Sequence, residues 1–332
     1  MDEKIDFVIT WVDESDPKWR KEFDYYSIQA GRKVDATPER YRDWGTLRYW
    51  FRGVEQFAPW VNKIYFVTYG HLPRWLNTNH PKLVIVCHED FIPKEYLPTF
   101  NSYCIEFHLH RIHQLSDHFV YFNDDMFLID NIKPDRFFKN GLPCDVGGLS
   151  VITTQGFFGY AVYMALDLIR QNFNMKEAVS QNRSKWYSME YPRLSLLNLL
   201  KFRQTIFPGF VNTHLPQAFL KETFEAVWSH CEEDIIRSCR QKFRDYGGVC
   251  FWLVRYWQLT SGNFTPYNIF KDGQLFPLMT NRRFNEAIDC IKYQKKKVIC
   301  VNDGEYTHFE DYKDKLLSAF EEILPQSSSF EL

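Results

Sequence analysis

Two adjacent acids at the end of an apolar run constrain this chain more than any other feature. Asn123, Asp124 and Asp125 follow the apolar residues 119–122 directly, and a second apolar run, residues 126–129, begins at once. Such runs are typical of strands buried on both faces of a sheet. Buried carboxylates are costly unless something pairs with them, and a divalent cation such as Mg²⁺ or Mn²⁺ is a suitable partner. The spacing therefore predicts a metal–diphosphate site at a strand's carboxyl end, or a tight turn, because Asn and Asp also favour turns.

Charge and cysteine usage exclude several classes of protein. The chain of 332 residues has a formal net charge of -2, so no strong positive field attracts nucleic acid. Its charged N-terminus does not resemble a signal peptide, and no apolar stretch approaches the length of a membrane span. The eight cysteines form no C-x-x-C motif, and Cys87, Cys250 and Cys300 lie within apolar runs. This pattern indicates buried thiols in a reducing compartment, so we expect a cytoplasmic protein.

The first half of the chain alternates between strand and helix patterns, which is typical of an α/β fold. The apolar residues predict strands at residues 6–12, 63–68, 82–87 and 118–122, and helices at residues 43–57 and 104–114. We therefore expect a mostly parallel, Rossmann-like (GT-A-like) sheet.

The second half has a mainly helical pattern. It predicts helices at residues 159–171, 191–201, 216–239 and 248–259, a returning strand at 297–301 and an amphipathic helix at 311–324. We expect a nucleotide-sugar and metal-binding core at residues 1–150, and a helical insertion at residues 151–290 that covers the cleft and contributes acceptor and phosphate contacts. Residues 291–332 then return to the core.

Trp11 and Asp13 close the first predicted strand. An indole and a carboxylate at this position suit a nucleoside, with the ring stacking on the base and the acid accepting a hydrogen bond. Alternatively, Trp11 belongs to the core and Asp13 caps the following helix. No G-x-G-x-x-G or G-x-x-x-x-G-K-[ST] motif is present, which argues against dinucleotide and P-loop binding.

Arginines cluster around the second predicted element, at positions 40, 42, 48 and 52. Arg48 and Arg52 are four residues apart and share a helix face, where paired guanidinium groups suit diphosphate oxygens. On spacing alone, arginines that merely face water are the better explanation of the pattern.

The predicted helix before the acidic pair carries Glu106, His110 and Arg111. Glu106 and His110 are four residues apart, so a carboxylate or an imidazole can point toward the cleft. A zinc site is less suitable, because His108, His110 and His113 do not share one face and no H-E-x-x-H motif occurs.

Two further polar positions follow apolar segments. His214 precedes a predicted helix, where an imidazole is either structural or a general acid or base. Asn302 and Asp303 end the returning strand and repeat the first acidic pattern, either as ligands on the other side of one metal site or as a turn before Gly304.

These residues fall in blocks that resemble the Stealth proteins, the sugar-phosphate transferases of bacterial capsule and exopolysaccharide synthesis. The blocks are also similar to the catalytic core of the animal enzyme that transfers GlcNAc-1-phosphate to lysosomal glycoproteins. The matching blocks, in family order, are residues 5–13 with Asp16-Pro17, residues 42–125 in several pieces from Arg42-Asp43-Trp44 to Asn123-Asp124-Asp125, His214-Leu215-Pro216, and residues 300–304. Tyr69 stands where many members have Asn.

The resemblance implies transfer of a sugar-1-phosphate from a nucleoside diphosphate-sugar, most often UDP-linked, to a sugar hydroxyl, with release of the nucleoside monophosphate. It implies Mg²⁺ or Mn²⁺ at Asp124, Asp125 and Asn302 or Asp303. The donor's phosphates would contact Arg48, Arg111 and Arg244, and the nucleoside would contact Trp11 and Asp13. The expected catalytic residues are His214, Asp125, Glu106 and Arg111, with His214 the first candidate for the acid or base and Glu106 the second.

Two other functions use the same features. One is a metal-dependent glycosyltransferase that attacks the anomeric carbon, and the other is a non-catalytic glycan-binding protein. The family expectation for the acceptor is a sugar or lipid-linked glycan, with peripheral contact at the inner membrane face, for which the helix at 311–324 is a candidate.

Overall fold

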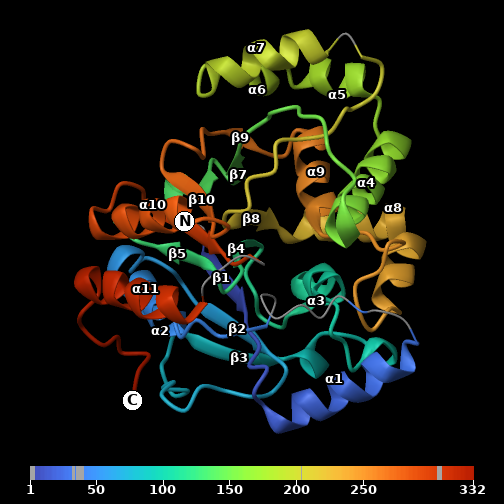
Figure 1. Ribbon diagram of the computed structural model, residues 1–332. Helices are drawn as coiled ribbons and strands as arrows, with labels where there is room; N and C mark the ends of the chain where they lie inside the picture. Colours follow the sequence, from blue (N-terminus) through green and yellow to red (C-terminus); the bar gives the residue numbers. More distant parts are fainter. Residues whose placement is uncertain (1–3, 32–33, 35–40, 203, 305–308) are drawn as a thin grey trace.

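A central sheet of mostly parallel strands organises the molecule (Figure 1). The computed structural model describes residues 4–31, 34, 41–202, 204–304 and 309–332. The strand order is β3–β2–β1–β4–β8, in which the first four strands are parallel and the fifth is antiparallel. Their bounds are β1 Ile5–Thr10, β2 Ile64–Thr68, β3 Leu83–Cys87, β4 His118–Phe122 and β8 Gln217–Leu220. The expected α/β class with a mostly parallel sheet is confirmed.

Both faces of this sheet are buried, as expected for parallel strands with apolar residues at consecutive positions. Along β1, Val8 belongs to the apolar core on one face, whereas Phe7 and Ile9 belong to the core on the other. The first core packs against α3 Ser102–His108, α4 Gly156–Asn172, α5 Met175–Gln181, α6 Arg183–Trp186, α8 Lys221–Cys239 and α9 Trp252–Ser261. The second packs against α2 Leu47–Phe57, α10 Asn281–Lys292 and α11 Phe309–Ile323.

Two small sheets complete the fold. In one, β11 (Val298–Asn302) lies between β10 (Gly273–Pro277) and β5 (Met126–Leu128). The other consists of β6 Phe138–Lys139, β7 Leu142–Asp145 and β9 Thr265–Pro266. The remaining helices are α1 Pro17–Gln29 and α7 Pro192–Lys201, with short 3₁₀ segments at His88–Asp90, Lys94–Tyr96, Leu109–Arg111 and Pro134–Arg136.

Three sequence-based expectations differ from this fold. The helix expected at 216–239 begins with a strand, β8, because a short apolar run does not by itself distinguish strand from helix. The helix expected at 104–114 ends at His108 and continues only as a 3₁₀ turn. The returning strand, β11, joins a second sheet instead of the central one.

The range expected to be a helical insertion is therefore not purely helical. It contributes β8 to the central sheet and β10 to the second sheet, so strands from residues 151–290 are built into both. The apolar face of α11 is occupied, since Tyr312, Leu316, Ala319 and Phe320 are buried in the second core. Among the described residues, no helix is both long and apolar enough to cross a membrane.

Candidate active site

A cavity of about 370 Å³ opens at the carboxyl ends of β1 and β4. Parallel α/β sheets bind ligands at this edge because successive connections diverge there. The cavity brings together the end of β1, the segment before α2, one face of α3, the turn after β4, the loop before β8 and the end of β11. Of the residues expected at the site, it is lined by Trp11, Glu106, Asp124, Asp125, His214, Arg244, Asn302 and Asp303.

The acidic pair lies in a tight turn between β4 of the central sheet and β5 of the small sheet that contains β11. The Met126 amide donates to the Asn123 carbonyl over 3.2 Å, and the Val301 amide donates to the Asp125 carbonyl over 2.8 Å. The sequence predicted a tight turn or a ligand site at residues 123–125, and the structure shows a tight turn that also lines the cavity. The turn brings the Asp125 carboxylate to the end of β11, where it contacts Asn302, and places Asp124 in the lining of the same cavity.

The Asp125 carboxylate has one crowded oxygen and one bare oxygen. Oδ2 accepts from the Asn302 Nδ2 at 3.0 Å and the Cys300 Sγ at 3.2 Å, and lies 3.4 Å from the His214 Nε2. Oδ1 is buried and has no hydrogen-bond partner among the described residues. Burial raises the pKa of Asp125, but the charge and hydrogen bond of His214, together with Asn302 and Cys300, outweigh it and lower the pKa. The carboxylate is therefore held ionised with one oxygen available to a cation.

The Asp124 carboxyl group differs from that of Asp125 in its exposure and in its pKa. Its side chain opens into the cleft, yet desolvation by the cleft walls, followed by the charges of Asp125 and Asp43, raises its pKa to about 7. Two adjacent carboxylates, one of them with a bare buried oxygen, fit Mg²⁺ or Mn²⁺, which favour carboxylate oxygens and often use one or two of them. The residues present therefore fit the divalent cation that the sequence implied.

Asp303 has a strong partner already. Its Oδ1 accepts from the Arg42 Nη2 at 2.6 Å, its Oδ2 pairs with the Arg42 Nε, and the Trp44 Nε1 donates to Oδ2 at 3.1 Å. This bidentate pair fastens the segment before α2 to the end of β11. Asp303 would have to leave Arg42 to ligate a cation, whereas Asp125 would not.

His214 faces Asp125 from a strained backbone. Its φ angle is +39°, a left-handed conformation that non-glycine residues seldom adopt. Burial lowers the pKa of His214, but the charge of Asp125, the hydrogen bond to it and the charge of Glu106 outweigh burial and raise the pKa. Because Nε2 faces Asp125, Nδ1 is the ring nitrogen that remains for a substrate proton.

Glu106 and Arg244 line another part of the cavity. Glu106 is buried and its Oε1 accepts from the Tyr121 hydroxyl over 3.4 Å. The Arg244 Nη2 donates to the Ser102 Oγ at 2.6 Å, and its guanidinium lies 4.6 Å from the centre of the Tyr103 ring. Glu106 of α3 thus contacts β4, and Arg244 is held against the first turn of α3, so a carboxylate and a guanidinium line the cavity beside the same helix.

Trp11 and Asp13 separate in the structure. The Trp11 ring lines the cavity and stacks on Phe66 with 5.6 Å between centroids. Asp13 does not line it: its Oδ1 accepts from the backbone N and hydroxyl of Ser15, which stabilises the β1–α1 turn. The cap of α1 is Asp16, not Asp13, since Asp16 accepts from the Trp19 amide at 2.8 Å.

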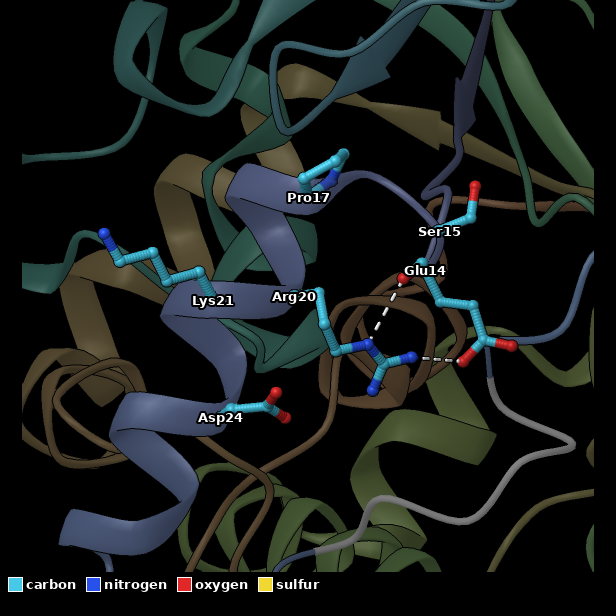
Figure 2. A pocket seen from close by; sticks show the side chains of 6 residues that line it. All are labelled: Glu14, Ser15, Pro17, Arg20, Lys21 and Asp24. Atoms are coloured by element: carbon cyan, nitrogen blue, oxygen red, sulfur yellow. Dashed lines mark hydrogen bonds and ion pairs between the residues drawn. The ribbon is translucent and has the colours of Figure 1, made fainter.

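A surface hollow lies beside this turn (Figure 2). Two of its charged side chains pair with each other, since the Arg20 Nη2 donates to Glu14 over 2.8 Å. It lies on α1, outside the cavity that holds the acidic pair, and we assign no function to it.

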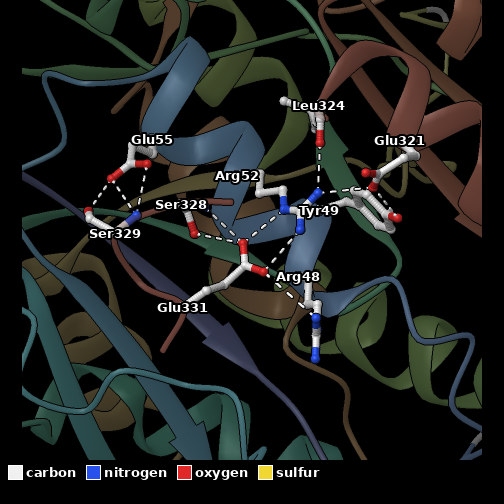
Figure 3. Close-up of polar contacts among 9 residues, drawn as sticks. All are labelled: Arg48, Tyr49, Arg52, Glu55, Glu321, Leu324, Ser328, Ser329 and Glu331. Carbon is white, nitrogen blue, oxygen red and sulfur yellow. Dashed lines mark hydrogen bonds and ion pairs between the residues drawn. The ribbon is translucent and has the colours of Figure 1, made fainter. Parts of the chain in front are cut away.

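Arg48 and Arg52 do share a face of α2, but that face turns to the C-terminal segment (Figure 3). Arg52 is buried and donates to Glu331, Glu321 and the Leu324 carbonyl. Arg48 lies 3.9 Å from a Glu331 oxygen and stacks over Trp75. Both arginines therefore hold the chain's end against α2 and do not line the cavity. Arg40 lies outside the described residues.

Arg111 and the histidines after α3 also lie elsewhere. The Arg111 guanidinium lies 4.5 Å from the Trp228 ring centre. His110 stacks on Phe224, and burial, followed by the charge of Arg111, lowers its pKa to about 3. His108 contacts Cys104 instead. The 3₁₀ turn after His108 ends the helical spacing on which a shared face depended.

Sequence reasoning did not select Arg42, Trp44 or Cys300 for the site. Arg42 and Trp44 stand in one of the recognised family blocks, but the choice of arginine rested on the four-residue spacing of the next helix. Cys300 was treated as a core thiol, and it is buried, but its Sγ also donates to Asp125. The order of residues along β11 places Cys300 and Asn302 on the same side of the strand, which was a usable signal.

A mostly parallel sheet with acidic and basic side chains at its carboxyl edge is typical of an α/β protein that binds a charged ligand there. The descriptions "Stealth protein CR1, conserved region 1" and "Stealth protein CR2, conserved region 2" match residues 3–31 and 40–144. The chain belongs to the Stealth family of polysaccharide phosphotransferases, and it is an enzyme of the phosphotransferase class.

Relatives that match along nearly their whole length support the family assignment. Capsular polysaccharide phosphotransferase WcwK of Streptococcus pneumoniae is 42% identical and covers 99% of this chain and 98% of its own. Receptor polysaccharide phosphotransferase WefC of Streptococcus gordonii is 39% identical over all of both chains. Exopolysaccharide phosphotransferase cps2G of Lactiplantibacillus plantarum is 34% identical, over 98% of this chain and 96% of its own.

Similarity to solved structures is much weaker. The galactosyltransferase LgtC has a TM-score of 0.38 at 11% identity and covers 94% of this chain and 95% of its own. The bifunctional glycosyltransferase WbbM has a TM-score of 0.37 at 11% identity, over 97% of this chain and 52% of its own. Values this low carry no argument, and the fold assignment rests on the strand order given above.

Proposed function

We propose that this enzyme transfers a sugar-1-phosphate from a nucleoside diphosphate-sugar to a sugar hydroxyl of a polysaccharide precursor. The observation that carries the proposal is the convergence of an ionised Asp125, the His214 imidazole and the Arg244 guanidinium on one cavity. Phosphoryl transfer requires positioning and charge neutralisation more than covalent chemistry, and these groups supply both. The names of the full-length relatives, which are capsular, receptor and exopolysaccharide phosphotransferases, point to the same reaction class.

The donor would lie across the cavity. Trp11 offers an aromatic face to the nucleoside, and Arg244 offers its guanidinium to the diphosphate. Arg42, which lines the cavity, would contact the donor's phosphates in the role expected of Arg48 from the sequence. Arg48, Arg111 and Asp13 have no role in this proposal, because none of them lines the cavity.

Asp124 and Asp125 would hold Mg²⁺ or Mn²⁺, with Asn302 positioning Asp125 through its amide. The ion, when bound, would neutralise charge on the phosphate oxygens of the donor. Asp303 remains a candidate ligand only if Arg42 transfers its hydrogen bonds to the substrate.

His214 would accept the proton of the acceptor hydroxyl on Nδ1, while Asp125 holds Nε2. The hydroxyl oxygen attacks the sugar-side phosphorus, a new O–P bond forms, and the bond to the nucleoside monophosphate breaks. The anomeric C–O bond is retained, so the product is a phosphodiester. Glu106 is the second candidate for the base, since it lies on the same cavity and its charge acts on His214.

We place the reaction in the cytoplasm. All eight cysteines are free and seven of them are buried, which is the pattern of a reducing compartment. A UDP-linked donor and a sugar or lipid-linked glycan acceptor follow the family expectation.

The identity of the released nucleotide tests the proposal. The purified enzyme is incubated with a panel of nucleoside diphosphate-sugars, an acceptor glycan and Mg²⁺ or Mn²⁺. We expect a nucleoside monophosphate and a product that contains phosphorus. Release of a nucleoside diphosphate together with a phosphorus-free product would establish a glycosyltransferase instead. If the protein released no nucleotide and did not bind the donor in a cation-dependent way, it would be a glycan-binding protein.

A further inference from the structure

Helix α7 presents four of its five leucines to solvent, while Leu194 is half-buried and the one fully buried side chain is polar. Within Pro192–Lys201, Leu196, Leu197, Leu199 and Leu200 are 62%, 43%, 56% and 61% exposed. The residue that α7 buries is Asn198. Surface helices of globular proteins normally have the opposite arrangement, with the apolar stripe toward the core.

Asn198 fixes this inverted orientation. Its Nδ2 donates to the Gly147 carbonyl at 2.6 Å and to the Trp186 carbonyl at 2.8 Å, while its Oδ1 accepts from the Leu149 amide at 2.8 Å. Rotation of α7 that would bury the leucines would break all three bonds and leave buried polar groups unpaired. The outward direction of the leucines is therefore built into the fold.

The exposed apolar surface extends beyond α7. Met189 is 85% exposed before the helix and Ile206 is 52% exposed after it. In Figure 1, α6 and α7 form the upper edge of the molecule, on the opposite side from α1 and the C-terminus. We call Met189, Leu196, Leu197, Leu199, Leu200 and Ile206 the leucine face. Several exposed apolar side chains on one helix and next to its ends are typical of an interaction site.

The charges around the leucine face are mostly positive. Residues 183–202 contain the basic side chains Arg183, Lys185, Arg193 and Lys201, against the single acid Glu190. Arg183 and Arg193 are exposed, and Lys201 bonds a backbone carbonyl, that of Leu149. Lys185 likewise donates to the Gly262 carbonyl, so the exposed cations are Arg183 and Arg193. Exposed leucines accompanied by exposed cations suit an anionic phospholipid surface, where the apolar side chains enter the acyl boundary and the cations contact headgroups.

A second protein molecule suits this face less well. A helix of ten residues is about 15 Å long and about 10 Å wide. Met189 and Ile206 add only two side chains to its outer face, so the leucine face falls short of the roughly 800 Å² per partner that a stable protein interface buries. A bilayer needs no matching shape, and shallow insertion of a few leucines is sufficient. We propose that the leucine face of α7 docks this enzyme on an anionic membrane surface. The proposal stands on α7 alone and is independent of the reaction proposed above.

Vesicle flotation tests this docking. The full chain is mixed with phosphatidylcholine vesicles that contain or lack 30% phosphatidylglycerol (roughly the range of anionic membranes). We expect the wild type to float with the anionic vesicles and to bind the neutral ones more weakly. Replacing Leu196, Leu197, Leu199 and Leu200 together by Gln should reduce partitioning at least ~100-fold, because each leucine loses apolar burial. The combined Arg183→Gln and Arg193→Gln variant should lose about fivefold per cation on anionic vesicles only.

The controls separate docking from general stickiness and from misfolding. Ile28→Gln and Tyr293→Gln alter side chains that are 80% and 71% exposed away from α7, and both variants should float like the wild type. Circular dichroism and Tm should be unchanged in the leucine variant, because its side chains lie in solvent.

Two results would overturn the proposal. One is equal flotation of the wild type and the leucine variant. The other is a wild type that binds neither vesicle but forms a dimer by light scattering that the leucine variant loses, which would make the face a contact between copies of this chain.

Discussion

Replacement of Asp125 by Asn removes one charge from the site and keeps the shape of the side chain. In the wild type, Oδ2 accepts hydrogen bonds from Asn302 and Cys300 and faces His214. An amide oxygen can take over these contacts, but the amide NH₂ would then occupy the buried position of Oδ1, where no described residue accepts a hydrogen bond. The variant thus loses the charge that pairs with His214 and the oxygen that is available to a cation.

Both losses reduce turnover, and their sizes can be compared. Loss of groups that merely support a metal ligand costs about 10–100-fold in affinity or activity, so loss of the ligand itself should cost at least ~100-fold. General acid–base catalysis contributes about 10²–10⁴-fold, and it depends on Asp125 to orient His214. We expect turnover to fall at least ~10⁴-fold, which corresponds to about 5.5 kcal/mol of transition-state stabilisation.

Three measurements check this reasoning. Release of nucleoside monophosphate gives turnover, electron paramagnetic resonance of Mn²⁺ gives metal binding, and an NMR titration gives the pKa of His214. Burial lowers that pKa and Asp125 is the largest contribution that raises it, so the pKa should fall in the variant. Asp130→Asn, on an acid that does not line the cavity, is the matched control. An Asp125→Asn enzyme with near-normal turnover and undiminished Mn²⁺ binding would refute the assignment of this cavity as the active site.

Other substitutions separate catalysis from stability. His214→Gln should keep Mn²⁺ binding and lose about 10²–10⁴-fold in turnover, whereas loss of both would mean that the imidazole serves only to hold the site together. Glu331→Gln should cost about 3 kcal/mol at pH 7 by chemical denaturation, because it breaks the buried pair with Arg52. Burial raises the pKa of Glu331, but the hydrogen bonds from Arg52 and Ser328 outweigh it and lower the pKa from 4.5. The pair's contribution is thus complete above pH 4.5 and is lost as pH falls, so the wild type and the variant should converge in acid. Gly53→Ala should destabilise by about 1–3 kcal/mol, since its Cβ would lie 2.6 Å from a backbone oxygen, and an unchanged Tm would contradict the close packing of α2 on β5.

The sequence by itself determined the sheet and much of the candidate site. The apolar runs of β1, β2, β3 and β4 are continuous because both faces of these strands are covered, and this is why their positions could be predicted to within a few residues. The acids after β4 and at the end of β11 could also be recognised in the sequence, because each follows a buried strand. A charge beside a buried strand requires a partner, and that requirement is visible without coordinates.

Only the tertiary structure decided which of the matching residue types meet. Arg42, Arg48 and Arg52 look alike in sequence, but α2 turns the last two toward Glu331, and the segment before α2 turns Arg42 toward Asp303. Helical spacing shows which side chains share a face, but the direction of that face depends on packing between distant segments.

Helix α7 is a second case in which the sequence does not show the direction of a helix face. Its leucines read as a buried stripe, because apolar side chains normally face the core. Their exposure follows from three hydrogen bonds of Asn198, two of them to residues 147 and 149, about fifty positions earlier in the chain, and one to residue 186. Local sequence specifies which segments become helices and strands, while long-range contacts specify which way those helices face, and the second kind of information exists only in the folded chain.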